Sequence, residues 1–303
     1  MEWQQILAFY QVARFKSFTK AASAVFRTQS AVSQQIKALE DELECRLFER
    51  IGRRRLLLTP AGERFLKFST ALLEQKEQLL SELNELKGLQ IGHLKLGSIF
   101  TVFYYLLPKL IKKYKAELPL VDLNIIARPP LEIIDLVRSG DINFGIAMES
   151  VVPLDLRVLR WKVADTILLV PLGHPLANEK LITPEQIGKY PLILPSKDLK
   201  YTTRKRLEEK LLKLGIKFKI IMESPSVVLS LKYVEEGLGL SFVTFPLEDK
   251  RCLQKKKMKV IPLTHLFEPD HVVVILRKNK PLAQYEKYFI DLLFGKKGYS
   301  ERG

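Results

Sequence analysis

The spacing of hydrophobic positions changes along the chain and predicts a different kind of element in each region. Up to about residue 43, apolar residues recur every three or four positions, which predicts three short helices. Ser17 and Thr28 stand where N-caps of the second and third helices belong. Two short extended segments, 47–50 and 56–58, then flank a turn that contains Gly52. This order of elements predicts a winged helix-turn-helix.

The third predicted helix has two chemically different faces. One face carries an apolar stripe, made of Val32, Ile36, Leu39 and Leu43. The other carries hydrogen-bonding groups and one cation, with no carboxylate before Glu40: Ser30, Ser33, Gln34 and Lys37. Such a face suits base edges and phosphates in a DNA major groove. A plain amphipathic helix in a small bundle is the alternative, and the flanking sequence favours the DNA-binding interpretation.

The turn of the predicted wing carries three successive arginines, which suit phosphate contact or insertion into a minor groove. A solvated basic loop is the alternative for this turn. Caps, polar helix face and wing together make up the expected DNA-binding residues: Ser17, Thr19, Thr28, Gln29, Ser30, Ser33, Gln34, Lys37, Arg53, Arg54 and Arg55.

A long helix is predicted to follow this region. Thr59 is its cap, and Pro60 occupies the first helical position. Apolar residues then recur seven positions apart, at Phe65, Leu72, Leu79 and Leu86, with Leu83 beside them. This repeat favours a coiled-coil seam between two copies of the chain, although packing on its own domain is the alternative. The segment 87–92 is predicted to end the helix as a hinge.

From His93 onward, strand and helix patterns alternate, which predicts α/β structure with a parallel sheet covered on both faces. A helix is expected from Thr101 to Tyr114, perturbed by Pro108. The chain is expected to leave one lobe near Trp161 and to return near Leu266, which predicts a two-lobed, hinged domain like a periplasmic binding protein. The expected domains are 1–59 (DNA-binding), 60–91 (linker helix and hinge) and 92–303 (effector-binding), with lobe I at 92–161 and 267–303 and lobe II at 162–266.

A small molecule is expected beyond the carboxyl ends of the strands, in the crevice between the lobes. Hydroxyls beside helix N-termini, together with Arg128, would favour an anionic effector. Helix capping is the alternative for each hydroxyl, and Ile99, Phe100 and Phe103 make this region unusually apolar. The expected effector-contacting residues are Ser98, Phe100, Thr101, Arg128, Met148, Thr202, Thr203 and Thr244.

The N-terminal residues closely resemble the DNA-binding domain of LysR-type transcriptional regulators. The resemblance is carried without gaps by Phe9, Ser17–Thr19, Ala21–Ala22, Gln29–Ser33, Ile36, Leu39–Glu40, Leu47–Arg50 and Leu58–Gly62. Glu44 departs from the family's usual glycine, and Ser30 from a common proline. Looser motifs extend the resemblance over nearly the whole chain: Leu107-Pro108, Gly140-Asp141-Ile142, Gly173–Leu176 and Gly237–Leu240.

The resemblance implies a sequence-specific, DNA-binding transcriptional regulator that responds to a small effector. The expected partners are double-stranded DNA, the effector and further copies of the chain, which would form a dimer through the linker helix and a homotetramer through the effector domains. RNA polymerase is a candidate partner. No cofactor other than the unidentified effector is expected.

Composition and cysteine usage agree with this interpretation. The 49 Lys and Arg residues outnumber the 34 Asp and Glu, and a net charge of +15 suits a polyanionic partner. The two cysteines, Cys45 and Cys252, form no CxxC pattern, and neither a signal peptide nor an apolar run of membrane-spanning length is evident. A cytoplasmic protein without a membrane partner is therefore expected.

No catalytic constellation is evident in the sequence. The four histidines are scattered and form no metal-binding motif, and neither a P-loop nor a GxSxG motif is present. An enzyme is therefore not expected. Two competing classes remain at this point: a solute-binding or enzymatic α/β protein with an accessory N-terminal bundle, and a non-specific nucleoid protein.

Overall fold

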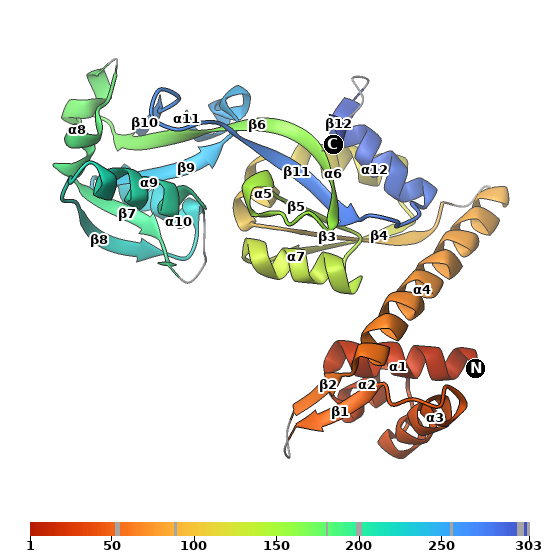
Figure 1. The fold of residues 1–303 in the computed structure, drawn as a ribbon. Helices are drawn as coiled ribbons and strands as arrows, with labels where there is room; N and C mark the ends of the chain where they lie inside the picture. The colour runs from red at the N-terminus through yellow and green to blue at the C-terminus, as the bar shows by residue number, and fades with distance from the viewer. Residues whose placement is uncertain are drawn as a thin grey trace. The chain divides into compact units, whose positions relative to one another are not determined.

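The computed structural model describes residues 1–51, 55–87, 90–179, 181–197, 202–254, 257–295 and 300–301. The chain divides into two compact units (Figure 1). The N-terminal unit comprises Met1–Leu89 with Lys280–Ala283, and the C-terminal unit comprises Gln90–Asn279 with Gln284–Gly303. Within the described residues, no helix has both the length and the hydropathy needed to cross a membrane.

The N-terminal unit begins with three helices: α1 (Trp3–Phe15), α2 (Phe18–Ala24) and α3 (Gln29–Glu42). Both predicted caps are confirmed. The Ser17 hydroxyl accepts a hydrogen bond from the Lys20 amide at 3.3 Å, and the Thr28 hydroxyl accepts one from the Ala31 amide at 3.2 Å. Each cap satisfies an amide that the first helical turn leaves without a partner.

An antiparallel hairpin follows, made of β1 (Phe48–Ile51) and β2 (Arg55–Leu58). The long helix α4 (Pro60–Leu86) begins directly after it. Thr59 caps this helix as predicted, because its hydroxyl accepts from the Gly62 amide at 3.0 Å and donates to the Arg46 carbonyl at 2.6 Å. Gly62 lies against the chain before the hairpin: a Cβ there would be 2.0 Å from the Leu47 carbonyl oxygen, so only glycine fits.

One hydrophobic core holds the N-terminal unit together. It joins the inward residues of all three helices to the hairpin, with Val32, Ile36 and Leu39 of α3 buried as predicted. Leu43, predicted to extend this stripe, is the C-cap of α3 and is 37% exposed, because the helix ends before it can turn inward. The start of α4 also packs on this core, with the rings of Phe65 and Phe9 edge-to-face at 4.7 Å.

The C-terminal unit is built on a mixed sheet with the strand order β4-β3-β5-β11-β6-β9-β7-β8; β10 and β12 also pair with β6. The strands are β3 (Gly92–Ser98), β4 (Val121–Ala127), β5 (Phe144–Met148), β6 (Leu156–Pro171), β7 (Pro191–Pro195), β8 (Lys219–Ser224), β9 (Leu240–Phe245), β10 (Met258–Pro262), β11 (Asp270–Arg277) and β12 (Ser300–Glu301). Pairing is parallel among β3, β4 and β5 and among β7, β8 and β9. The prediction of a parallel sheet therefore holds within each lobe.

The strands that join the lobes depart from that prediction, because they pair antiparallel. The first half of β6 pairs with β11 as far as Ala164, and its second half pairs with β9 and β10 from Asp165 onward. One long strand thus passes from lobe I into lobe II, and β11 accompanies it, as Figure 1 shows. The two passages were predicted, but their antiparallel pairing was not, because sequence alternation does not reveal which strands become neighbours.

Helices cover the sheet of the C-terminal unit. The α-helices are α5 (Phe100–Tyr105), α6 (Pro108–Glu117), α7 (Pro130–Ser139), α8 (Pro184–Gly188), α9 (Thr202–Lys213), α10 (Val227–Glu235), α11 (Arg251–Gln254) and α12 (Gln284–Phe294). The 3-10 turns are η1 (Glu149–Val151), η2 (Pro175–Asn178) and η4 (Leu247–Asp249). The single perturbed helix expected over 101–114 is two helices, because Pro108 lacks an amide and begins a new helix instead of continuing the old one.

Candidate nucleic-acid interface and small-molecule pocket

Helix α3 presents the predicted polar face to solvent. Ser30, Ser33, Gln34 and Lys37, hereafter the recognition face, are exposed, whereas the stripe on the other side of the helix is buried. The remaining predicted contact residues of the caps and of α2 differ in exposure: Thr19, Thr28 and Gln29 are exposed and Ser17 is half-buried. The structure therefore brings an unobstructed row of hydrogen-bonding groups to the surface of one helix.

Glu40, the first carboxylate on α3, has a structural partner. Its Oε1 accepts hydrogen bonds from the amides of Leu47 and Phe48, at 2.6 and 3.1 Å. These bonds attach the start of the hairpin to α3 and satisfy the charge of the carboxylate. Glu40 therefore links α3 to the hairpin without placing an unpaired negative charge beside the polar face of α3.

The predicted wing is only partly described. Arg53 and Arg54 lie outside the described residues, and Arg55 begins β2 with its side chain outside them. Phe26 and Arg27, which were not among the predicted contact residues, are both exposed in the turn before α3. Phe26 is 95% exposed and adopts a positive φ of 53°. The exposure of Phe26 could not be predicted from the spacing of hydrophobic residues, because turns follow no hydrophobic repeat.

The C-terminal unit contains a pocket at the carboxyl ends of its strands. The space in and around the pocket that no atom occupies is about 740 Å³, and this includes solvent at its open mouth. Residues of both lobes line it: Ile99, Thr101, Val102, Leu106, Pro130, Ala147, Met148, Val151, Pro195, Thr203, Val227, Phe242, Val243, Thr244, Phe245, Pro246 and Val272.

The expected effector-contacting residues separate into two groups. Thr101, Met148, Thr203 and Thr244 line the pocket, and the Thr203 and Thr244 hydroxyls form a hydrogen bond of 2.7 Å across α9 and β9. Ser98, Phe100 and Arg128 are not among its lining residues. Thr202 begins α9, but its side chain lies outside the described residues. Val227 at the start of α10 and Pro246 after β9 line the pocket without having been expected, because apolar residues there resemble ordinary core.

Ser98 and Arg128 are engaged elsewhere. The Ser98 side chain is fully buried, and its hydroxyl donates to the Ile146 carbonyl at 2.7 Å. Arg128 is 56% exposed; its guanidinium donates to the neighbouring Ala127 carbonyl at 2.8 Å and lies 3.7 Å from the Glu132 carboxylate. Strand ends can be located from sequence, but the direction of each side chain depends on the twist of the sheet.

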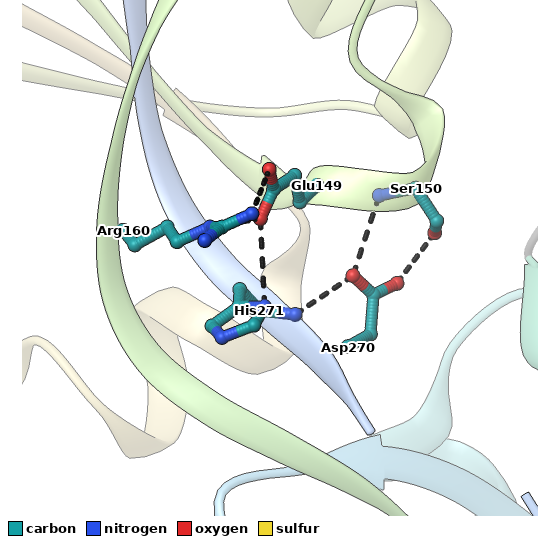
Figure 2. A network of polar contacts seen from close by, with 5 residues as sticks. All are labelled: Glu149, Ser150, Arg160, Asp270 and His271. Atoms are coloured by element: carbon teal, nitrogen blue, oxygen red, sulfur yellow. Dashed lines mark hydrogen bonds and ion pairs between the residues drawn. The ribbon is translucent and has the colours of Figure 1, made fainter. Parts of the chain in front are cut away.

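A polar network ties the two joining strands to the turn after β5 (Figure 2). Arg160 of β6 donates two hydrogen bonds to the Glu149 carboxylate, at 2.7 and 3.0 Å, and this interaction raises the pKa of Arg160. His271 Nδ1 of β11 lies 3.4 Å from the same carboxylate. Asp270, which is buried, accepts hydrogen bonds from the amide and hydroxyl of Ser150 and from the His271 amide. The network thus fixes β6, β11 and η1 where lobe I meets the pocket.

Comparisons with known proteins identify both units. Residues 3–63 match the family model of the bacterial regulatory helix-turn-helix protein of the lysR family, and residues 87–296 match the LysR substrate binding domain. Among curated proteins, the chain is 29% identical to the HTH-type transcriptional regulator Cbl of Escherichia coli, covering 96% of this chain and 92% of Cbl. It is 28% identical to the regulator SsuR of Burkholderia cenocepacia, covering 96% and 94%.

Solved structures of the same family share the fold. The cofactor-binding domain of Cbl matches 69% of this chain and 90% of its own, with a TM-score of 0.60 and 26% identity. A full-length OxyR variant from Pseudomonas aeruginosa matches 97% of this chain and 96% of its own, with a TM-score of 0.69 and 23% identity. The matching families are transcriptional regulators and not enzymes. With a DNA-binding helix-turn-helix in one unit and a two-lobed α/β domain in the other, the chain belongs to the LysR family of transcriptional regulators.

Proposed function

We propose that this regulator recognises a specific operator through the recognition face of α3 and responds to a small effector in the pocket between the lobes. The observation that carries the operator part is the exposed, carboxylate-free row of Ser30, Ser33, Gln34 and Lys37 above a buried stripe. Serine and glutamine side chains can donate to or accept from base edges, whereas lysine contributes a phosphate or guanine contact. The remaining predicted contacts of the caps and wing position this helix on the duplex.

We further propose that the chain acts in the cytoplasm as a dimer through α4 and as a dimer of dimers through its effector domains. Two recognition helices related by a two-fold axis would contact two half-sites of a palindromic operator. Effector binding would favour one arrangement of the lobes, since a ligand shifts an equilibrium only by its differential affinity for the two states. The support for the effector part is the pocket itself and the match to a domain of Cbl described as cofactor-binding. RNA polymerase is the expected further partner.

A footprint on the DNA upstream of the protein's own gene, at several salt concentrations, tests the operator proposal. We expect sequence-dependent protection that weakens as salt rises. Ser33→Ala and Gln34→Ala should each reduce the preference for operator over random DNA, by about 1–3 kcal/mol for a lost base contact. Arg54→Ala, in the predicted wing, should weaken binding to all sequences alike.

Two outcomes would contradict the operator proposal. Uniform protection of unrelated DNA would identify a non-specific nucleoid protein instead. Identical behaviour of the α3 and wing variants would show that α3 does not carry the sequence preference.

A further inference from the structure

The lining of the interlobe pocket points to a ligand chemistry that differs from the expected one. Every described lining residue is aliphatic, aromatic, proline, methionine or threonine; none is a lysine, arginine, histidine, aspartate or glutamate. An ionised ligand entering such a pocket loses hydration without meeting a fixed counter-charge, which is costly. The pocket therefore favours molecules that carry no net charge.

The nearby arginines do not change this preference for uncharged ligands, because each already has a carboxylate partner. Arg128 lies beside Glu132, and Arg160 is held by two hydrogen bonds to Glu149. Arg204 follows Thr203 in α9, but its guanidinium is buried against Glu208, Glu223 and the Pro195 carbonyl. Burial lowers the pKa of Arg204, yet the hydrogen bonds to both carboxylates more than offset this and raise it. A ligand anion would have to compete with these carboxylates for the guanidinium groups.

Two of the helix N-termini at the pocket, those of α7 and α10, offer few backbone donors to an anion. Pro130 occupies the first turn of α7, so one of the amides that would point to a ligand is missing. The amide of Leu229 in the first turn of α10 already donates to the Ser226 hydroxyl at 3.3 Å. Backbone donors for a phosphate or carboxylate are thus reduced at both helices.

The threonines of the lining supply a limited hydrogen-bonding capacity. In the Thr203–Thr244 pair one hydroxyl donates to the other, so the accepting hydroxyl keeps a proton to donate. Thr101, in the first turn of α5, adds a third hydroxyl on the lobe I side. These groups suit one or two polar atoms on an otherwise apolar molecule.

We propose that the effector of this regulator is an uncharged, mainly apolar small molecule whose one or two polar atoms meet the Thr203–Thr244 pair and Thr101. The inference rests on the proposed function, because it assigns a ligand class to the same interlobe site. It replaces the anionic effector expected from hydroxyls beside helix N-termini.

Matched probe pairs test the ligand class on the full-length chain. Benzamide against benzoate, and cyclohexanol against cyclohexanecarboxylate, compare a neutral molecule with a carboxylate of similar size; sodium sulfate and phosphate are the inorganic probes. Ligand-observed NMR and calorimetry at constant ionic strength should give saturable binding of the neutral members, about tenfold tighter than their carboxylate partners. Tighter or equal binding of a carboxylate, sulfate or phosphate overturns the proposal, as does failure of both neutral probes to bind at millimolar concentration.

Variants place the binding in the pocket. Thr244→Val keeps the side-chain shape but removes the hydroxyl, and should weaken neutral-probe binding about fivefold to tenfold. Thr166→Val is the matched control, since Thr166 pairs with Thr244 in register but does not line the pocket. Met148→Lys should make the pocket bind the carboxylate probe more tightly than its neutral partner, because it adds a positive charge. Met148→Leu is its control. Equal binding by the Thr244→Val and Thr166→Val variants overturns the assignment to the threonine pair.

Measurements of operator affinity distinguish a failure of the proposed ligand class from a failure of the proposed function on which it rests. If neutral probes bind the pocket but leave operator affinity unchanged, the ligand class stands and the proposed effector response fails. If the chain binds no operator, the proposed DNA recognition fails while the probe titrations still decide the ligand class.

Discussion

At the scale of single residues, the helices on both sides of the helix-turn-helix turn end in the same strained way. Glu44 follows α3 with a φ of 51°, and the amides of Glu44 and Cys45 donate to the carbonyls of Asp41 and Glu40. Phe26 follows α2 in the same arrangement, with its amide bonded to the Ser23 carbonyl. These are Schellman motifs whose left-handed position normally holds glycine. Glu44, which stands where the family usually has glycine, thus holds a strained backbone conformation.

We expect Glu44→Gly to stabilise the N-terminal unit by about 1 kcal/mol, because glycine avoids the left-handed strain but loses some of the gain through a more flexible unfolded chain. Denaturant unfolding of the full chain, followed by a signal from the N-terminal unit, measures the change. Glu44→Ala is the matched control, since alanine keeps the β-carbon and should bring no gain. Equal stability of the glycine and alanine variants would contradict the strain argument.

Tyr105 is a residue whose hydroxyl is buried without a described hydrogen-bond partner. Its ring packs edge-to-face on Phe245 of β9, 5.9 Å between centroids, so it joins α5 of lobe I to lobe II. Burial, followed by the charges of Tyr104, Glu235 and Cys252, raises the pKa of Tyr105 from 10.0 to about 12. The fold therefore favours the neutral phenol.

Because the folded pKa of Tyr105 is raised, its contribution to stability is present below pH 10 and is lost as pH rises toward 12. We expect Tyr105→Phe to stabilise the C-terminal unit by about 1 kcal/mol at neutral pH, since it removes a buried hydroxyl without a partner. The gain should grow above pH 10, and unfolding measured across this range checks it. Tyr104→Phe, at an exposed ring, is the control and should show no gain at neutral pH.

At the scale of elements, helix α4 has two different surroundings along its length. Phe65 and Leu66 pack on the core of the N-terminal unit. This part of the helix therefore packs on its own domain, which was the alternative to a coiled coil. Farther along, the repeat positions face solvent: Leu79, Leu80, Leu83 and Leu86 are each at least 44% exposed. A row of exposed leucines on one helix is costly unless a second copy covers it.

We expect Leu79→Glu combined with Leu83→Lys to separate the two chains that α4 would join and so to halve the mass of the assembly. The pair removes the apolar seam but keeps a favourable helix spacing. Light scattering coupled to size-exclusion chromatography measures the mass, and operator affinity should fall with it. Gln78→Glu combined with Glu82→Lys places the same charges at adjacent helix positions and should leave the dimer intact. An assembly of unchanged mass after the leucine changes would place the interface elsewhere.

The joining strands β6 and β11 depend on the polar network at Asp270. We expect Asp270→Asn to destabilise the C-terminal unit by about 1–3 kcal/mol, because an amide cannot accept all the bonds that Ser150 and His271 donate to the carboxylate. Asp155→Asn is the control: that carboxylate is 55% exposed beside Arg138, and its loss should cost less than about 1 kcal/mol. Thermal unfolding of both variants gives the comparison, and equal losses would argue against a structural role for the network.

At the scale of the whole molecule, the two units have separate hydrophobic cores. The N-terminal core lies among α1, α2, α3 and the hairpin, and the C-terminal cores lie along the mixed sheet. We therefore expect calorimetry to resolve two unfolding transitions. Glu44→Gly should raise only the transition of the N-terminal unit, and a bound neutral probe only that of the C-terminal unit. A single transition that both changes shift together would show that the units unfold as one.

The sequence by itself determined the elements whose signals are local. Caps at Ser17, Thr28 and Thr59 depend on side chains within three residues of the amides they satisfy, so short motifs were enough to place them. The buried stripe and polar face of α3 followed from helical periodicity in the same way. The family was also evident at this level, because its motifs are dense and ordered along the chain.

Only the tertiary structure decided features that depend on distant neighbours. Thr203 and Thr244 meet across 41 positions, and the pocket they share with Met148 forms where two lobes approach each other. The same packing turned Ser98 inward to Ile146, so this hydroxyl is not among the pocket lining that sequence position had suggested. Side-chain direction is set by sheet twist and by long-range contacts, so the lining of the pocket became evident only once the chain was folded.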